Sequence, residues 1–354
     1  MWFAGNGILT QLSTHFGLQA NALGHLTSAV QFGFISGTLL FSIFTIADRV
    51  SPSRVFFACA LLGAFSNLGI LWTGNTLLSL IGIRFVTGFF LAGIYPVGMK
   101  IAADYFDQGL GKSLGFLVGA LVLGTAFPHA LQGISFTVSW QAVVWLISGI
   151  AILGGTLLMV SVPDGPYRQA AFQLDIKAVK VVFQNTSFKK AAFGYFGHMW
   201  ELYAFWTFVP VLLTAYANTH KVIQLSISYW AFVIIAIGAL GCIAAGLLSA
   251  RFQTISIARI SLIISGLCCL SAPLLIWLNW PLFIGVLLLW GVAVIADSPM
   301  FSTLVAQNAS PKHKATALTI VNCIGFSITI LSIQLLTFLQ GFLSVEYLFV
   351  FLAL

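Results

Sequence analysis

The apolar, aromatic stretch from Phe193 to Pro210 holds two ionisable side chains at its centre, His198 and Glu201. A spacing of three residues places both on one side of a helix. A charged side chain in the middle of a bilayer costs about 2.5–3.5 kcal/mol on insertion scales, so it needs a partner or a water-filled cavity. Glu201 could therefore load and release protons near neutral pH, or bind a cationic part of a substrate, with His198 as its partner. The alternative is a structural hydrogen bond to a neighbouring helix.

Two more ionisable residues lie in apolar surroundings, Arg84 and Asp297. Arg84 is the one basic residue placed well inside an expected membrane span, where it either binds an anionic substrate or is locked by carbonyl groups of the first helix. Asp297 directly precedes Ser298 and Pro299, and a proline frees a carbonyl group and can open a helix locally. Asp297 therefore marks a hinge or a binding site, or it caps the break.

Uncharged polar side chains in the expected spans add weaker candidates. Asn6 and Tyr203 are included as possible substrate-binding residues, Asn6 because its helix is the counterpart of the one that carries Glu201. Taken singly, such groups more often form hydrogen bonds between helices, and the same holds for Gln31, Tyr229 and Asn322.

Motifs of metal binding and metal catalysis are absent from the sequence, which contains no HExxH or CxxC. Its cysteines lie inside apolar segments, so neither a disulfide framework nor a zinc site is indicated. We expect no enzyme activity, no cofactor and no metal.

The elements that position these residues follow from composition. Hydrophobic residues make up 60% of the chain and charged residues 6%, with a mean hydropathy of +1.03, whereas a soluble domain carries about 25% charged residues. Long apolar runs recur, each sufficient to cross about 30 Å of hydrocarbon as a helix. The sequence predicts an all-α polytopic membrane protein with twelve segments, at 1–12, 22–46, 55–73, 76–103, 113–132, 140–162, 190–215, 223–250, 256–278, 281–306, 315–339 and 345–354.

The distribution of positive charge predicts the orientation. With the N-terminal side in the cytoplasm, thirteen of the fifteen Lys and Arg residues fall in or beside cytoplasmic loops; Lys221 falls outside and Arg84 within a span. Cytoplasmic loops carry such an excess of Lys and Arg. The net charge of +7 is therefore a sign of topology, and we expect no nucleic-acid partner.

The chain divides into two related halves. A polar loop at 163–189, in which Phe172, Ile176, Val179 and Phe183 recur at helical spacing, separates a six-helix bundle at 1–162 from a second at 190–354. A shift of 203 residues lays Gly88 on Gly291 and Pro96 on Pro299. The first and last segments are too short to span the bilayer, so we expect both terminal helices to be truncated.

At this point the chain resembles the major facilitator superfamily. The loop ADRVSPSR is similar to the family's short charged loop through Asp48, Arg49 and Arg54, and LIGIRFVTGFFLAG is similar to its RxxxG pattern through Arg84 and Gly88. The segments GIYPVGMK, LGFLVGALVLGTAFPHAL and GHMWELYAFW resemble a bacterial subgroup of nitrate/nitrite-type or uncharacterised transporters. The resemblance implies two pseudo-symmetric six-helix bundles around a central site, with Asp48, Arg49 and Arg54 at a cytoplasmic gate.

Together these features predict a secondary transporter that moves a small molecule or ion by alternating access, with protons coupled through Glu201. We expect a monomer in the lipid bilayer of a bacterial plasma membrane. Arg84, His198, Glu201 and Asp297 would line the central site. Arg84 favours an anionic substrate, Glu201 a cation or protons, and both together a zwitterion. The alternative is a membrane receptor that keeps the fold without moving a substrate.

Overall fold

The computed structural model describes residues 1–19, 21–106, 110–134, 138–168, 181–221, 225–310 and 314–353, and helices are the only regular elements in these ranges. Nine helices of the described part are long and apolar enough to cross a membrane. Large apolar side chains such as Leu78, Val160 and Trp277 are exposed on their outer surfaces. The chain is therefore an all-α polytopic membrane protein, as its composition predicts. The nine spans are Ala22–Ile43, Pro52–Leu71, Leu77–Tyr105, Gly111–Gly133, Trp140–Ser161, Ile227–Leu248, Thr254–Leu275, Trp280–Asn308 and Thr316–Leu339.

The helix that carries His198 and Glu201 is the longest. Helix α11 runs over Thr186–Thr219, 34 residues, which corresponds to about 51 Å. It begins at Asn185, whose side chain accepts hydrogen bonds from the N–H groups of Ser187 and Phe188. Although long, α11 is not one of the nine spans above, because its many polar and aromatic residues lower its mean hydropathy.

Three of the long expected spans are each broken into two helices, and the short first segment is likewise divided between α1 (Ala4–Gly7) and α2 (Leu9–Phe16). The fourth consists of α6 (Leu77–Leu91) and α7 (Tyr95–Tyr105), the eighth of α12 (Ile227–Ala236) and α13 (Gly238–Leu248), and the tenth of α15 (Trp280–Ala296) and α16 (Ser298–Asn308). Pro96 and Pro299 stand in the first turns of α7 and α16, where a missing N–H costs least. The sequence predicted the opening at Pro299 but not the other two breaks.

Glycine contacts repeat between the two halves at the expected offset. A Cβ atom on Gly88 of α6 would overlap the carbonyl oxygen of Val30 in α3 (Ala22–Ile43), and one on Gly291 of α15 would overlap the carbonyl oxygen of Ile234 in α12. Gly82 and Gly285, which are also 203 residues apart, would meet nothing within 4 Å. The fourth and tenth spans thus cross their neighbours in the same way, which is what a duplicated bundle requires.

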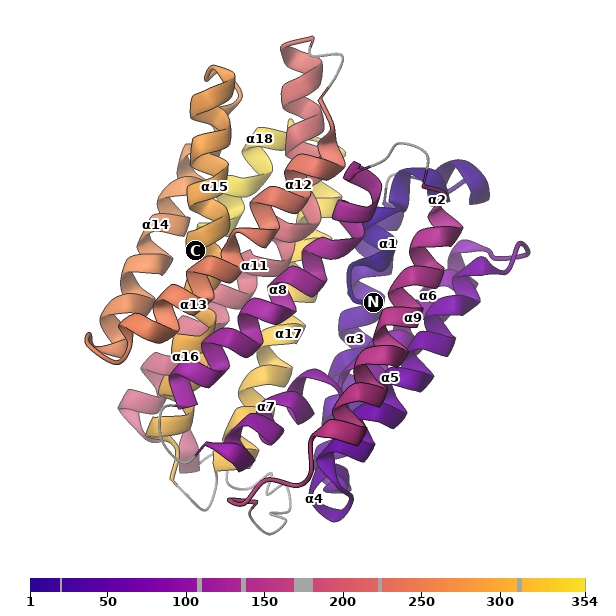
Figure 1. The fold of residues 1–354 in the computed structure, drawn as a ribbon. Helices are drawn as coiled ribbons and strands as arrows, with labels where there is room; N and C mark the ends of the chain where they lie inside the picture. The colour runs from indigo at the N-terminus through magenta and orange to yellow at the C-terminus, as the bar shows by residue number, and fades with distance from the viewer. Residues whose placement is uncertain are drawn as a thin grey trace.

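Two helix pairs join the halves (Figure 1). Helix α8 (Leu110–Ile134) packs along α12 and α13, and α17 (Lys314–Leu339) packs along α3 and α11. Hydrogen bonds cross the second pair: Thr329 donates to Gln31 Oε1 at 2.6 Å, and Gln334 donates to Ser28 Oγ at 2.8 Å.

The remaining helices complete the two groups. They are α1 (Ala4–Gly7), α2 (Leu9–Phe16), α4 (Ile46–Arg49), α5 (Pro52–Leu68), η1 (Gly69–Leu71), α9 (Trp140–Ser161), α14 (Thr254–Leu275), α18 (Val345–Leu348) and η3 (Phe349–Leu352). The amphipathic helix expected in the polar loop falls largely on residues 169–180, which lie outside the described ranges.

Candidate functional site

Glu201 lies near the middle of α11 and is only 3% exposed. Three donors from neighbouring helices surround its carboxylate: Trp290 Nε1 of α15 at 2.7 Å and Cys269 Sγ of α14 at 3.3 Å both reach Oε1, and Ser265 Oγ of α14 reaches Oε2 at 2.8 Å. Within the described residues no basic side chain forms an ion pair with it. Glu201 is therefore a buried acid that is hydrogen-bonded without being neutralised. Sequence reasoning did not find these three donors, because no spacing connects them.

His198 is not bonded to Glu201, contrary to our expectation. Its Nδ1 atom lies 2.7 Å from Oδ1 of Asp297, and both side chains are 1% exposed. The orientation of these two atoms does not meet hydrogen-bond geometry, although they lie close together. A spacing of three residues put His198 and Glu201 on one side of α11, but the break before α16 brings Asp297 closer to the imidazole.

Arg84 is held by backbone carbonyl groups. Its guanidinium donates to the carbonyl oxygen of Met1 at 3.0 Å and to that of Trp2, while its Nε atom has no partner in the described structure. The side chain is 1% exposed. These carbonyl contacts tie Arg84 to the residues that precede α1.

Tyr203 belongs to an aromatic cluster that connects the halves. Its ring centroid lies 5.4 Å from that of Trp2 and 5.3 Å from that of Phe326 in α17, and Trp2 and Phe326 each also pack on Phe34 of α3. The carbonyl group of Trp2 thus accepts a hydrogen bond from Arg84, and the ring of Trp2 contacts the ring of Tyr203. The Arg84 and Glu201 regions are linked through aromatic packing, with no direct polar contact between them in the described residues.

Asn6, Asn322 and Gln31 form hydrogen bonds between helices, whereas Tyr229 is 44% exposed. Asn6 donates to Thr27 Oγ1 of α3 at 2.9 Å, and Asn322 of α17 accepts from the Tyr195 hydroxyl at 2.9 Å. His129 of α8 is 2% exposed, and its Nε2 atom finds no partner in the described ranges.

Charged residues gather where α3 meets α5. Asp48 forms an ion pair of 2.9 Å with Lys100 of α7, a residue that sequence reasoning had not assigned to the gate. Arg49 donates to Thr45 Oγ1 at 2.9 Å, and Arg54 is exposed. Arg168 donates to the carbonyl oxygen of Asp48 at 2.8 Å, so these contacts connect the first half of the chain to the loop at 163–189.

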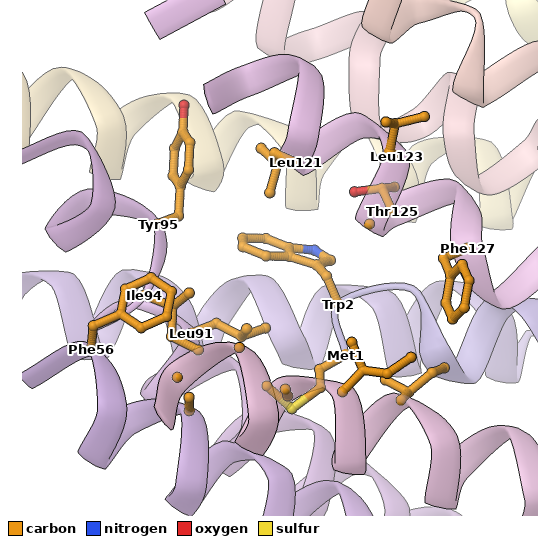
Figure 2. A pocket seen from close by; sticks show the side chains of 17 residues that line it. Met1, Trp2, Phe56, Leu91, Ile94, Tyr95, Leu121, Leu123, Thr125 and Phe127 are labelled. Atoms are coloured by element: carbon orange, nitrogen blue, oxygen red, sulfur yellow. The ribbon is translucent and has the colours of Figure 1, made fainter. Parts of the chain in front are cut away.

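A cavity of about 530 Å³ lies within the first half rather than between the halves. Figure 2 shows Trp2 reaching into it, with Tyr95, Leu121 and Phe127 around the opening. Its walls come from the start of the chain and from α5, α6, α7, α8 and α9, and they are almost entirely apolar. None of Arg84, His198, Glu201 and Asp297 lines it. No Lys, Arg, His, Asp or Glu side chain is among the residues that line this cavity.

The described residues contain no group of three or more His, Cys, Asp and Glu side chains that could hold a metal ion. The cysteines at 59, 242, 268, 269 and 323 are buried and free.

Comparison with known proteins gives the family. The sequence model of the Major Facilitator Superfamily matches residues 1–333. The chain belongs to the major facilitator superfamily. No curated protein sequence matches it.

Solved structures of the same fold are similar over nearly the whole chain. The human organic anion transporter MFSD10 (TETRAN) superposes with a TM-score of 0.70 at 14% identity, covering 98% of this chain and 86% of its own. A bacterial homologue of the human lysosomal transporter Spinster, inward-facing and unoccupied, gives 0.69 at 16% identity, with coverages of 96% and 79%. A mutant of the nucleoside transporter NupG gives 0.69 at 14% identity, with 99% and 92%. At these identities the likeness shows the fold alone.

Family membership decides the broad function. This facilitator chain is a membrane transporter of small molecules and not an enzyme. The bacterial subgroup suggested by its sequence is not resolved by these comparisons.

Proposed function

We propose that this transporter is proton-coupled and works by alternating access, with Glu201 as its proton-binding group. The observation that carries the proposal is the environment of Glu201, 3% exposed and surrounded by three hydrogen-bond donors without a counter-ion in the described residues. Burial opposes the charged form of such a group, and hydrogen bonds partly offset that cost. The charge of Glu201 is therefore linked to how much water reaches it.

Alternating access supplies the change in water access. We take residues 1–162 and 190–354 as the two bodies that rock against each other, joined by the linker 163–189. The contacts of α8 with α12 and α13, and of α3 with α17, form the surfaces on which they move. When the bodies part on one side, water reaches the centre and Glu201 exchanges its proton with that side; when they close, the proton is trapped.

The substrate is proposed to be a small molecule or ion that meets the centre between the bodies. Arg84 supplies the buried positive charge for an anionic group, and its unpartnered Nε atom leaves one donor free for that purpose. Tyr203 and the aromatic side chains around it supply a flat apolar wall. We place the protein as a monomer in a bacterial plasma membrane with its N-terminal side in the cytoplasm, as the Lys and Arg distribution favours.

The test has two stages. A thermal-shift screen of the purified protein against anions, amino acids and sugars identifies a ligand, and that ligand is then used in proteoliposomes. Glu201→Gln should abolish accumulation driven by a proton gradient while counterflow of labelled ligand continues, because the neutral side chain cannot release a proton. Glu346→Gln, which changes the chain's other glutamate, is the matched control and should behave as the wild type. Proton-driven accumulation by Glu201→Gln would overturn the proposal.

A further inference from the structure

The breaks in the fourth and tenth spans differ in one respect. Residues 92–94, between α6 and α7, are Ala, Gly and Ile, whereas Asp297 stands at the junction of α15 and α16. The two junctions occupy corresponding places in the repeat, with Tyr95 and Pro96 matching Ser298 and Pro299. A duplicated fold therefore carries an ionisable group at the junction in its second half and none at the junction in its first.

The partner of Asp297 comes from a different helix. His198 of α11 reaches it with 2.7 Å between Nδ1 and Oδ1, so the contact ties α11 to the junction of the tenth span. The second atom of each group, His198 Nε2 and Asp297 Oδ2, is buried and has no partner in the described structure. Polar groups that serve only structure in a core usually have their hydrogen bonds satisfied, whereas none of the four side-chain polar atoms of this pair has a hydrogen-bond partner in the described structure.

Among the described residues, the titratable groups that act on this pair supply no positive charge. Glu201 of α11 and Cys242 of α13 are the other titratable groups on which Asp297 acts electrostatically, and neither carries positive charge. Phe301 of α16 and Tyr195 of α11 flank the imidazole ring. With one proton the pair is electrically neutral overall, whether that proton sits on the imidazole or on the carboxylate. Without it, a single negative charge remains buried.

We infer that His198 and Asp297 together form a second proton-binding site, which holds α11 to the break of the tenth span while it carries its proton. The inference deepens the proposed function and rests on it for the role of the proton in transport. The step involves proton transfer alone. A water molecule that reaches the exposed site accepts the proton, which leaves a neutral imidazole beside a carboxylate and removes the ionic part of the attraction between the two side chains. The α11 contact then loosens, and α16 becomes free to move relative to α15.

The expected behaviour is that of a coupled pair rather than of two independent groups. Asp297→Asn removes the negative charge that stabilises a protonated imidazole of His198 in these apolar surroundings. His198→Asn keeps the carboxylate but takes away its partner. The proton count and the midpoint of binding therefore respond to different members of the pair.

Proton counting tests the inference without knowledge of the substrate. The full chain is reconstituted in lipid nanodiscs, and the protons taken up per molecule are measured with a pH electrode between about pH 9 and about pH 5. Asp297→Asn should take up about one proton fewer than the wild type. His198→Asn should change the proton concentration at which this site is half-occupied by about tenfold or more. Size-exclusion chromatography and circular dichroism establish that each variant is folded.

Tyr195→Phe is the matched control, since it removes a hydrogen bond of α11 three residues from His198 without removing a charge. It should leave both the proton count and the midpoint unchanged. Uptake curves of Asp297→Asn and His198→Asn that both coincide with the wild-type curve would show that the pair is only a structural link. Glu201→Gln should remove a different proton, so the inference can stand even where the proposal for Glu201 fails.

Discussion

Glu201 accepts a hydrogen bond of 2.7 Å from the indole N–H of Trp290, and both side chains are buried inside the second half of the chain. Trp290 directly precedes Gly291, the residue at which α15 crosses the backbone of α12. The donor to the acid and the closest helix crossing of the tenth span are thus adjacent in sequence. The hydrogen bond to Glu201 and the crossing with α12 therefore lie within the same turn of α15.

Trp290→Phe should destabilise the protein through Glu201. The substitution keeps an aromatic ring but removes one donor from a buried carboxylate, and a hydrogen bond to a charged group contributes about 1.5–3 kcal/mol. Unfolding in detergent, followed by near-ultraviolet circular dichroism, should show a loss of that size. The double variant with Glu201→Leu isolates the pair, because Trp290→Phe should cost much less once the carboxylate is gone. Equal costs in the two backgrounds would contradict a specific hydrogen bond.

Alanine substitutions at two related glycines should be equally damaging. Gly88→Ala and Gly291→Ala each place a methyl group against a carbonyl oxygen of the neighbouring helix, and overpacking of this kind costs about 1–3 kcal/mol. Gly82→Ala and Gly285→Ala provide a control in the same two helices, where a methyl group meets nothing within 4 Å. Thermal unfolding of the four variants checks the prediction. A stable Gly291→Ala variant beside an unstable Gly88→Ala variant would argue against equivalent crossings.

Composition and charge sufficed to predict the fold class, because a chain with 6% charged residues cannot cover a water-facing surface. The residues at the centre could be chosen for the same reason, since His198, Glu201 and Asp297 stand out in apolar segments. Their pairing could not be predicted. Periodicity places residues on one helix, whereas the contact between His198 and Asp297 depends on where α15 ends and how α11 packs on α16.

The hydrogen-bond donors to Glu201 could not be predicted from the sequence either. Ser265, Cys269 and Trp290 are ordinary residues of apolar spans, and nothing in their own sequence neighbourhood marks them. Their role arises because α14 and α15 both pack near α11. Lys100 was likewise grouped with the loop charges that set the topology, and only the three-dimensional structure pairs it with Asp48.

Arg84→Lys should lower stability although it conserves the charge. The guanidinium reaches two carbonyl groups, of Met1 and Trp2, in a fork that a single ammonium group cannot reproduce. The loss of one hydrogen bond from a buried cation should cost about 1.5–3 kcal/mol in thermal unfolding. Arg259→Lys, at an exposed position of α14, is the control and should change little. Wild-type stability of Arg84→Lys would show that the carbonyl contacts do not hold this residue.

Loss of the Asp48–Lys100 ion pair should change the transport rate while leaving the stability of the protein nearly unchanged. The two side chains are 2.9 Å apart and about one-quarter exposed, so the pair contributes no more than about 1 kcal/mol to folding. Lys100→Ala should therefore unfold at nearly the wild-type temperature.

If the pair locks one state of the transporter, however, its loss should change the rate of counterflow several-fold. The exchanged variant Asp48→Lys/Lys100→Asp should restore that rate only in part, because attraction to residue 48 is retained while the new aspartate lies beside Asp104, the second partner of Lys100. Arg54→Gln, which changes an exposed charge nearby, should leave the rate unaltered. A rate in Lys100→Ala equal to that of the wild type would limit this charged cluster to fixing the orientation of the chain in the membrane.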